Sequence, residues 1–370
     1  MADTIVFHTA SLTGGGAERV FVLMANEFAA RGHRVILFTW NAGGPNAGLL
    51  SPGVELIDLG LPIRGEGYGK LGTLRGLLRS VAVFRRLKPD AVYSAPEFAN
   101  LLMALALVLA RSRARFFPSF HAAASLPSGR IGARIAVLLS KLVAFRTTKA
   151  IAVSRGVGRD VVARGVLGAK VAVINNPLPV STAAPQSAVT SLRQKVAAMG
   201  EGPVLVTAGR LVAIKDHRTL LAAFAKLRSR RPARLVICGE GPLRQSLEQY
   251  AAELGISGSV LFPGYITDPD ACYAVADLFV LSSISEGFGN VLVEALGAGV
   301  PVVSTDAPHG PREILSDGEF GPLVPVGDVD ALAKAIEITL DTSLPSETLK
   351  RRAADFAIGV IGDRYEALLA

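Results

Sequence analysis

Two glutamates near an apolar segment have the spacing and surroundings of a binding site. Glu286 lies in the glycine-rich loop SEGFGN that follows DLFVLSS (277–283), and Glu294 lies eight residues further along. Eight residues make about two helical turns, so Glu294 would return to a similar face of a helix. Both glutamates could simply face solvent, but Glu294 is flanked by valines and leucines. This setting favours a binding role over a surface charge.

The loop that carries Glu286 could also bind through its backbone. Glycines at positions 287 and 289 let amides approach a ligand, and a helix beginning at Asn290 would favour an anion at its N-terminus. A carboxylate and a helix N-terminus at one strand end can together bind different parts of a nucleotide sugar.

Two cations occupy an equivalent position after another predicted strand. Arg210 directly follows the strand in PVLVTAGRL (203–211), and Lys215 lies five residues later in the loop that enters a helix. Arginine offers a forked pair of donors and lysine a point charge, so the pair suits a diphosphate. The alternative is that both are ordinary surface cations.

A third motif, SLTGGGAERV (11–20), follows the first predicted strand. Its glycines, Gly15 and Gly16 among them, would let backbone amides and the next helix N-terminus contact an anion. The motif differs from the dinucleotide fingerprint, and the next strand ends at Trp40 without an acidic residue for a ribose hydroxyl. A nicotinamide site is therefore not expected, and a plain tight turn remains the alternative.

One histidine follows an apolar stretch in RFFPSFHAAASLP (115–127). His121 could donate a hydrogen bond or move a proton near neutral pH. A single histidine is more often structural, so this residue alone decides nothing.

Strands alternate with helices in both halves of the 370-residue chain. This order predicts two Rossmann-like domains with parallel sheets, separated by a Pro- and Ser-rich linker at 175–190. We place the boundary near residue 180, giving domains 1–180 and 181–355. Ligands of such sheets bind at the carboxyl ends of the strands, where the motifs above lie.

The net charge of +8 is unevenly distributed: residues 1–180 carry a balance of +13 and the remainder −5. Basic residues alternate with apolar ones at 75–88, 101–115 and 130–149. Such segments favour an anionic membrane surface, with solvated core helices as the alternative. Nucleic acid is not expected, because no binding motif or aromatic stacking pattern occurs.

Two cysteines, Cys238 and Cys272, exclude a disulfide scaffold and indicate reduced thiols. No secretory segment is recognised at the start of the sequence. We therefore expect a cytoplasmic protein, peripheral on the inner face of the cytoplasmic membrane.

Together these segments resemble the retaining glycosyltransferases of family 4, which have the GT-B fold. The resemblance covers nearly the whole chain in order: GGGAER, GRL…K, CGEGPLRQSLE (238–248) and EGFGNVLVEALGAGVPVVS. The spacing of Glu286 and Glu294 is its most specific signal. It implies two Rossmann-like domains across a cleft, with residues 356–370 crossing back to the first.

The resemblance also implies roles for individual residues. Gly15 and Gly16 would face the donor phosphates or the acceptor, and Arg210 and Lys215 would hold the diphosphate. Glu286 would face the donor sugar, with His121 near the transferred sugar. Glu294 would bind the ribose hydroxyls, and the amides of Phe288, Gly289 and Asn290 would contact the sugar hydroxyls or the phosphate. Gly239 and Gly241 would lie at the base.

No metal or other cofactor is implied, since the two cations and helix dipoles would stabilise the leaving nucleoside diphosphate. The expected partners are a nucleotide-sugar donor, by default a UDP-sugar, and a lipid-linked or saccharide acceptor. GDP-mannose as donor and a soluble acceptor stay open. A non-catalytic binding subunit and an epimerase or phosphorylase of the same fold are disfavoured by the retained motifs.

Overall fold

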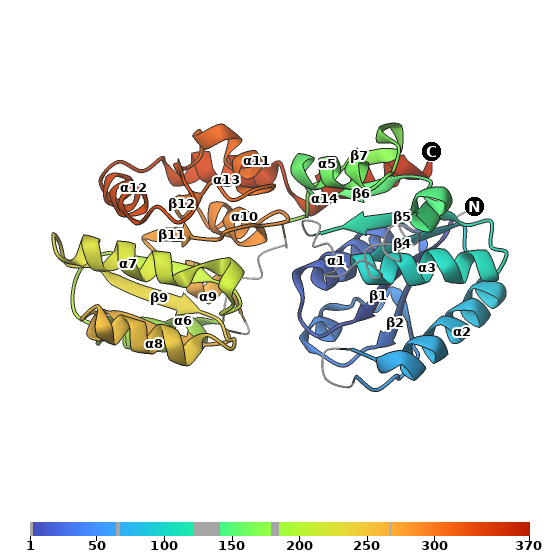
Figure 1. Ribbon diagram of the computed structural model, residues 1–370, viewed down its shortest axis with the longest axis horizontal. Helices are drawn as coiled ribbons and strands as arrows, with labels where there is room; N and C mark the ends of the chain where they lie inside the picture. The colour runs from blue at the N-terminus through green and yellow to red at the C-terminus, as the bar shows by residue number, and fades with distance from the viewer. Residues whose placement is uncertain (1–2, 64–66, 122–140, 179–184, 267) are drawn as a thin grey trace, which may run out of the picture. The chain divides into compact units, whose positions relative to one another are not determined.

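The computed structural model describes residues 3–63, 67–121, 141–178, 185–266 and 268–370. They form two compact units, one ending at Pro177 and completed by Ile358–Ala370, the other spanning Leu178–Ala357 (Figure 1). The boundary between the units lies between Pro177 and Leu178. The sequence analysis placed it near residue 180. Each unit is described by itself below.

The first unit is built on a seven-stranded parallel sheet in the order β3-β2-β1-β4-β5-β6-β7. The strand order reverses direction between β1 and β4, which is where open parallel sheets bind ligands. The central strands are buried on both faces and rich in apolar residues, as parallel sheets require. The strands are β1 (Thr4–Ser11), β2 (Arg34–Asn41), β3 (Val54–Asp58), β4 (Ala91–Ala95), β5 (Arg115–Phe120), β6 (Ala150–Ala152) and β7 (Val171–Val173).

Crossover helices cover this sheet, and aromatic side chains fill the space beneath α1. Phe7 on β1 stacks on Tyr93 of β4 at 4.9 Å and meets the edges of Phe21 and Phe28 of α1. The helices are α1 (Gly16–Ala30), α2 (Gly69–Leu87), α3 (Glu97–Leu109), α5 (Arg155–Ala163) and α14 (Ile358–Glu366), with residues 141–146 also helical. Short 3-10 turns lie at Pro45–Leu49, Gly168–Lys170 and Ala367–Leu369.

The C-terminal helix α14 is anchored within the first unit by an arginine of α1. Arg31 pairs with Glu366 at 2.6 Å and with Asp363 at 2.8 Å, while Glu27 orients its guanidinium from the same helix. His33 lies 2.9 Å from the second oxygen of Glu366. Residues more than 300 positions apart in the chain therefore share one charged cluster.

This cluster predicts an acid-sensitive contribution to stability. Hydrogen bonds from His33 and then Arg31 lower the pKa of Glu366 below its ordinary 4.5. Stabilisation is therefore full above the unfolded-state pKa and disappears as the pH falls through the folded-state pKa. We expect Glu366→Gln to lower the melting temperature by a few degrees at neutral pH, with the difference disappearing as the pH falls through the lowered pKa of Glu366.

Thermal unfolding across pH measures this effect. Glu55→Gln is the matched control, because among the described residues Glu55 has a single, exposed ion pair, with Arg34 at 3.3 Å. An equal loss in both variants, or a pH-independent loss in Glu366→Gln, would contradict the role given to the cluster.

The second unit is built on a six-stranded parallel sheet in the order β10-β9-β8-β11-β12-β13. Its order reverses between β8 and β11, so the loops after these two strands meet at one edge. The strands are β8 (Val204–Ala208), β9 (Arg234–Cys238), β10 (Val260–Gly264), β11 (Leu278–Leu281), β12 (Val302–Thr305) and β13 (Leu323–Val324).

Helices on both faces bury this second sheet, and leucine, valine and isoleucine dominate the core beneath α7 and α12. The helices are α6 (Gln186–Ala197), α7 (His217–Arg228), α8 (Arg244–Glu253), α9 (Asp270–Tyr273), α10 (Asn290–Gly297), α11 (Pro311–Ile314), α12 (Val329–Asp341) and α13 (Ser346–Ala354). Short 3-10 turns lie at Ala213–Lys215, Ser257–Ser259 and Ser316–Gly318.

The two Rossmann-like domains predicted from the sequence are confirmed, but the linker is shorter than predicted. Helix α6 already begins at Gln186, inside the segment 175–190 that was assigned to the linker. Pro185 stands at the N-cap of this helix, and Val189 and Leu192 on one side of it are buried. The basic segment at 130–149 lies partly outside the described residues, and only its end at 141–146 is seen as helix.

Candidate functional site

The loop after β11 is fixed by hydrogen bonds to the loops after the neighbouring strands. Thr305 at the end of β12 donates its hydroxyl to the Ser283 carbonyl at 2.7 Å. On the other side, the Ile284 amide donates to the Ile214 carbonyl at 2.8 Å. The Gly-rich loop is therefore held from both flanking strands before any ligand binds.

Glu286 projects from this loop into a cluster of polar groups. Its Oε1 accepts hydrogen bonds from the Ser283 hydroxyl at 2.6 Å and from the Lys215 Nζ at 2.5 Å. The side chain of Glu286 is 11% exposed and that of Lys215 22% exposed. The structure thus brings together two residues that the sequence singled out separately.

Lys215 is positioned by the 3-10 turn that follows β8. Ser282 donates its hydroxyl to the Lys215 carbonyl at 2.9 Å, and Asp216 then caps α7 by accepting from the Thr219 amide. Burial, and then the Lys215 charge, lower the pKa of His217 to about 4, so this histidine is neutral at pH 7. The local positive charge therefore comes from lysine and arginine.

Arg210 lies on the same loop and is exposed. Among the residues that the structure describes, it has no ion-pair partner for its guanidinium. Lys215 has an ion-pair partner and Arg210 has none in the described ranges, so within these ranges Arg210 can bind an anion without first breaking an ion pair.

Glu294 lies on α10 and is held by a buried tyrosine of α9. The Tyr273 hydroxyl donates to Glu294 Oε2 at 2.8 Å, and the tyrosine is only 2% exposed. Burial, and then the nearby Glu294 charge, raise the pKa of Tyr273 well above its ordinary value. The phenol therefore remains a hydrogen-bond donor. Sequence reasoning missed Tyr273, which stands in the ordinary segment DACYAVADLFV.

The other predicted residues of the loop after β11 also contribute to packing. Gly289 adopts a φ of +104° at the N-cap of α10, a conformation that favours glycine, and Asn290 begins the helix. Phe288 is buried against Phe356, so its side chain belongs to the core. A Cβ at Gly310 would lie 1.6 Å from the Phe288 carbonyl oxygen, which shows how closely the next loop packs.

Gly239 and Gly241 follow β9 and permit close approach of two loops. A Cβ on Gly239 would lie 1.9 Å from the Gly209 carbonyl oxygen, and one on Gly241 would lie 2.5 Å from that of Leu211. Both glycines are thus required for packing, and their predicted place at a base stays a prediction.

Gly15 and Gly16 of the first unit mark the start of α1, but a side chain already contacts this turn. Glu18 Oε2 accepts from the Gly15 amide at 2.6 Å and from the Gly14 amide at 3.1 Å. The Ser11 hydroxyl donates to Oε1 at 2.9 Å. A phosphate could reach the Gly15 amide only if the Glu18 carboxylate moved, a constraint that the sequence motif did not indicate.

His121 directly follows β5, and its Nε2 lies 2.9 Å from the Ser119 hydroxyl. Burial lowers the pKa of His121 to about 4. The imidazole is therefore neutral at pH 7 and suited to hydrogen bonding more than to carrying a charge. Its Nδ1 has no hydrogen-bond partner in the described part of the chain.

The predicted residues divide between the two units. Gly15, Gly16 and His121 lie in the first, while the cations, both glutamates and the α10 loop lie in the second. In the described ranges, no cluster of three His, Cys, Asp or Glu side chains has metal-binding geometry. No helix within those ranges has the length and apolarity needed to span a membrane.

Comparison with known proteins gives the family. Residues 14–182 match Glycosyltransferase Family 4 and residues 189–356 match Glycosyl transferases group 1. A lipopolysaccharide core biosynthesis glycosyltransferase, LpsE of Rhizobium meliloti, is 38% identical over 48% of this chain and 53% of its own length.

A second relative is the N-acetylgalactosamine-N,N'-diacetylbacillosaminyl-diphospho-undecaprenol 4-alpha-N-acetylgalactosaminyltransferase of Campylobacter jejuni. It is 34% identical over 40% of each chain. The matched part of the chain thus spans about half, or less, of the length of these curated relatives.

A solved structure shares the fold over the full length. Anabaena HepE in complex with UDP and glucose superimposes with a TM-score of 0.80 and 23% identity, covering 99% of both chains. The matches to both family halves, in the order found here and with two Rossmann-like units, show that the chain belongs to glycosyltransferase family 4 (glycosyl transferases group 1) and has the GT-B fold.

Proposed function

We propose that the protein is a retaining glycosyltransferase that takes a sugar from a nucleoside-diphosphate sugar. The observation that carries this proposal is the cluster at the β8 and β11 strand ends. There Lys215 contacts Glu286 at 2.5 Å, and Tyr273 holds Glu294 on α10, the helix that follows the Glu286 loop. A diphosphate, a sugar and a ribose each need a partner, and this edge supplies cations and two separately held carboxylates.

The chemistry follows from these charges. As the bond between the anomeric carbon and the diphosphate oxygen breaks, the electron pair leaves with the nucleoside diphosphate. Arg210, Lys215 and the N-terminus of α10 stabilise the negative charge that develops there, without a metal. Glu286 stabilises the positive charge of the oxocarbenium-like sugar.

The acceptor hydroxyl then attacks from the face that the leaving group occupied. Its oxygen bonds to the anomeric carbon, its proton passes to the departing phosphate oxygen, and the configuration is retained. The neutral His121 contributes a hydrogen bond to the transferred sugar.

The proposed donor is a UDP-sugar, and the proposed acceptor is a membrane-borne saccharide linked to a polyprenyl diphosphate, in bacterial polysaccharide or glycan biosynthesis. The UDP complex of Anabaena HepE supports the base, and the undecaprenol-linked substrate in the name of the Campylobacter relative supports the acceptor. The basic first unit supports a location on an anionic membrane surface, at the inner face of the cytoplasmic membrane. The alternatives are GDP-mannose as the donor and a soluble molecule as the acceptor.

A thermal-shift panel with UDP, GDP, ADP and their common sugars tests the donor. A ligand that binds only the folded state raises the melting temperature by mass action. We expect a clear shift with UDP and UDP-sugars. A shift with GDP and GDP-mannose alone would replace the proposed base, and no shift with any nucleotide would contradict the donor site.

Tyr273→Phe tests how Glu294 is held. The change removes one hydrogen bond to a carboxylate, so we expect the donor KM to rise about 10-fold while kcat changes little. Steady-state kinetics measure the split, with Tyr250→Phe on α8 as the control. An equal fall in kcat, or no change in KM, would contradict ribose binding by a positioned Glu294.

A further inference from the structure

Helix α2 of the first unit presents a stripe of leucines to solvent. Leu71 is 63% exposed, Leu74 50% and Leu78 58%. Their spacing of three and four residues places them on one face of the helix, while Val83 and Phe84 on another face are buried. Soluble domains rarely leave such contiguous apolar surface uncovered unless it binds something.

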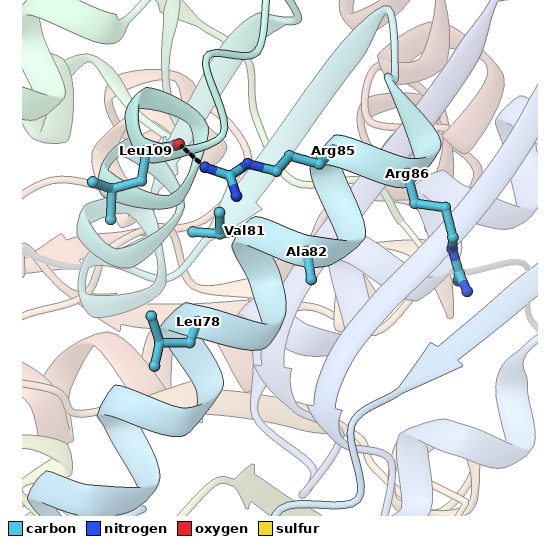
Figure 2. Close-up of a pocket in the computed structure, with 6 residues that line it drawn as sticks. All are labelled: Leu78, Val81, Ala82, Arg85, Arg86 and Leu109. Carbon is cyan, nitrogen blue, oxygen red and sulfur yellow. Dashed lines mark hydrogen bonds between the residues drawn. The ribbon is translucent and has the colours of Figure 1, made fainter.

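The stripe continues into an open groove between α2 and α3, which pack against each other. Figure 2 shows Leu78 and Val81 of α2 on the side of Leu109 at the end of α3, and Ala82 also lines the groove. The groove encloses about 630 Å³. Arg85 crosses its end and donates to the Leu109 carbonyl at 2.9 Å.

Positive charge surrounds this apolar surface. Lysines and arginines without an ion-pair partner among the described residues lie along α2 and after α3: Lys70, Arg75, Arg79, Arg85, Arg86, Arg111 and Arg113. Between residues 67 and 113, which hold α2 and α3, the sequence has eight lysines and arginines and only two acidic residues, Asp90 and Glu97. The surface is therefore complementary to an extended negative charge.

The arrangement favours a lipid surface over nucleic acid. Exposed leucines beside arginines are typical of helices that lie in the interface of an anionic bilayer. Nucleic-acid surfaces use polar side chains and several stacking aromatics, but α2 and α3 carry two aromatic residues, of which Phe84 is buried and Phe98 is exposed. A partner that contacted this surface through phosphate groups alone would leave the three exposed leucines in water.

We propose that the α2–α3 surface, comprising the leucines 71, 74 and 78, the groove and the surrounding arginines, docks on an anionic phospholipid membrane. The leucines enter the boundary between headgroups and acyl chains, and the arginines bind lipid phosphates. This inference rests on the proposed function, because docking would bring the first unit to a membrane-borne acceptor.

Flotation of the full chain with lipid vesicles tests the surface. Vesicles of phosphatidylcholine mixed with phosphatidylglycerol are compared with phosphatidylcholine alone, at low and high salt. The wild type is expected to float with the anionic vesicles and to be released by salt, because screening weakens the charge contacts.

Three variants assign the binding to this surface. Arg75→Gln/Arg86→Gln is expected to weaken partitioning about 30-fold, from the usual contribution of each basic residue. Leu71→Gln/Leu74→Gln/Leu78→Gln is expected to weaken it about 10-fold or more, even at low salt. Arg230→Gln/Arg231→Gln is the control, because these arginines already pair with Glu337 and Asp341 in the second unit.

The control removes the same total charge, so an equal loss there would overturn the proposal. Undiminished vesicle binding by the arginine or the leucine variant would also overturn it. So would a wild type that binds duplex RNA or DNA but does not bind anionic vesicles. UDP binding by each variant is measured in parallel. An unchanged thermal unfolding transition shows that the first unit, which carries the leucine and arginine variants, is folded, whereas absence of UDP binding in the wild type counts against the proposed function and leaves the vesicle result standing.

Discussion

Glu286→Gln is expected to lower turnover of the nucleotide-sugar donor about 100-fold or more while the protein stays folded. The substitution keeps the size of the side chain but removes the negative charge that the proposed mechanism places at the sugar as positive charge develops. It also removes the ionic partner of Lys215, which lies 2.5 Å away, and leaves the Ser283 hydroxyl with a weaker acceptor.

Release of nucleoside diphosphate measures this loss, and the melting temperature checks the fold. Glu253→Gln is the matched control, since Glu253 lies exposed at the end of α8 beside Gln249. Near-normal turnover by Glu286→Gln, with the control also active, would contradict the catalytic role proposed for Glu286.

Arg210→Gln and Lys215→Gln are each expected to weaken UDP binding about 10- to 100-fold, because a hydrogen bond to a charged group is lost in each. Arg210 should show the larger effect on affinity. It is without an internal partner among the described residues, whereas Lys215 must share its charge with Glu286.

Calorimetric titration with UDP and with uridine separates the phosphate contacts from the rest. Uridine lacks the diphosphate, so its affinity should not change in either variant. Lys334→Gln, on the exposed side of α12, controls for loss of one positive charge. Equal weakening of uridine and UDP would place both cations outside the phosphate site.

The sequence was sufficient to predict the two parallel sheets and the strand ends at which the site lies. Lys215 and Glu286 are 71 residues apart, yet they meet because β8 and β11 are neighbours in the sheet. The alternation of strands and helices predicts such a sheet, and its strand ends carry the residues with chemistry. The Glu286 and Glu294 motif then selects the family.

The supporting contacts could not be predicted in the same way. Tyr273 reaches Glu294 from another helix, and such a contact between distant residues leaves no periodic signal in the sequence. Glu18 occupies the amides of its own turn through a local hydrogen bond that the glycine pattern does not indicate. His121 looks like a residue that titrates near neutral pH, but burial lowers its pKa to about 4.

The most direct test of the account is real-time NMR of slow donor hydrolysis, in which water takes the place of the acceptor. The α-linked donors UDP-glucose, UDP-N-acetylglucosamine and GDP-mannose are each incubated with the protein, without added metal. The account predicts that a UDP-sugar releases UDP and that the α-anomer of the free sugar appears first. Initial release of the β-anomer, or no release of nucleoside diphosphate from any donor, would contradict retaining transfer from a nucleotide sugar.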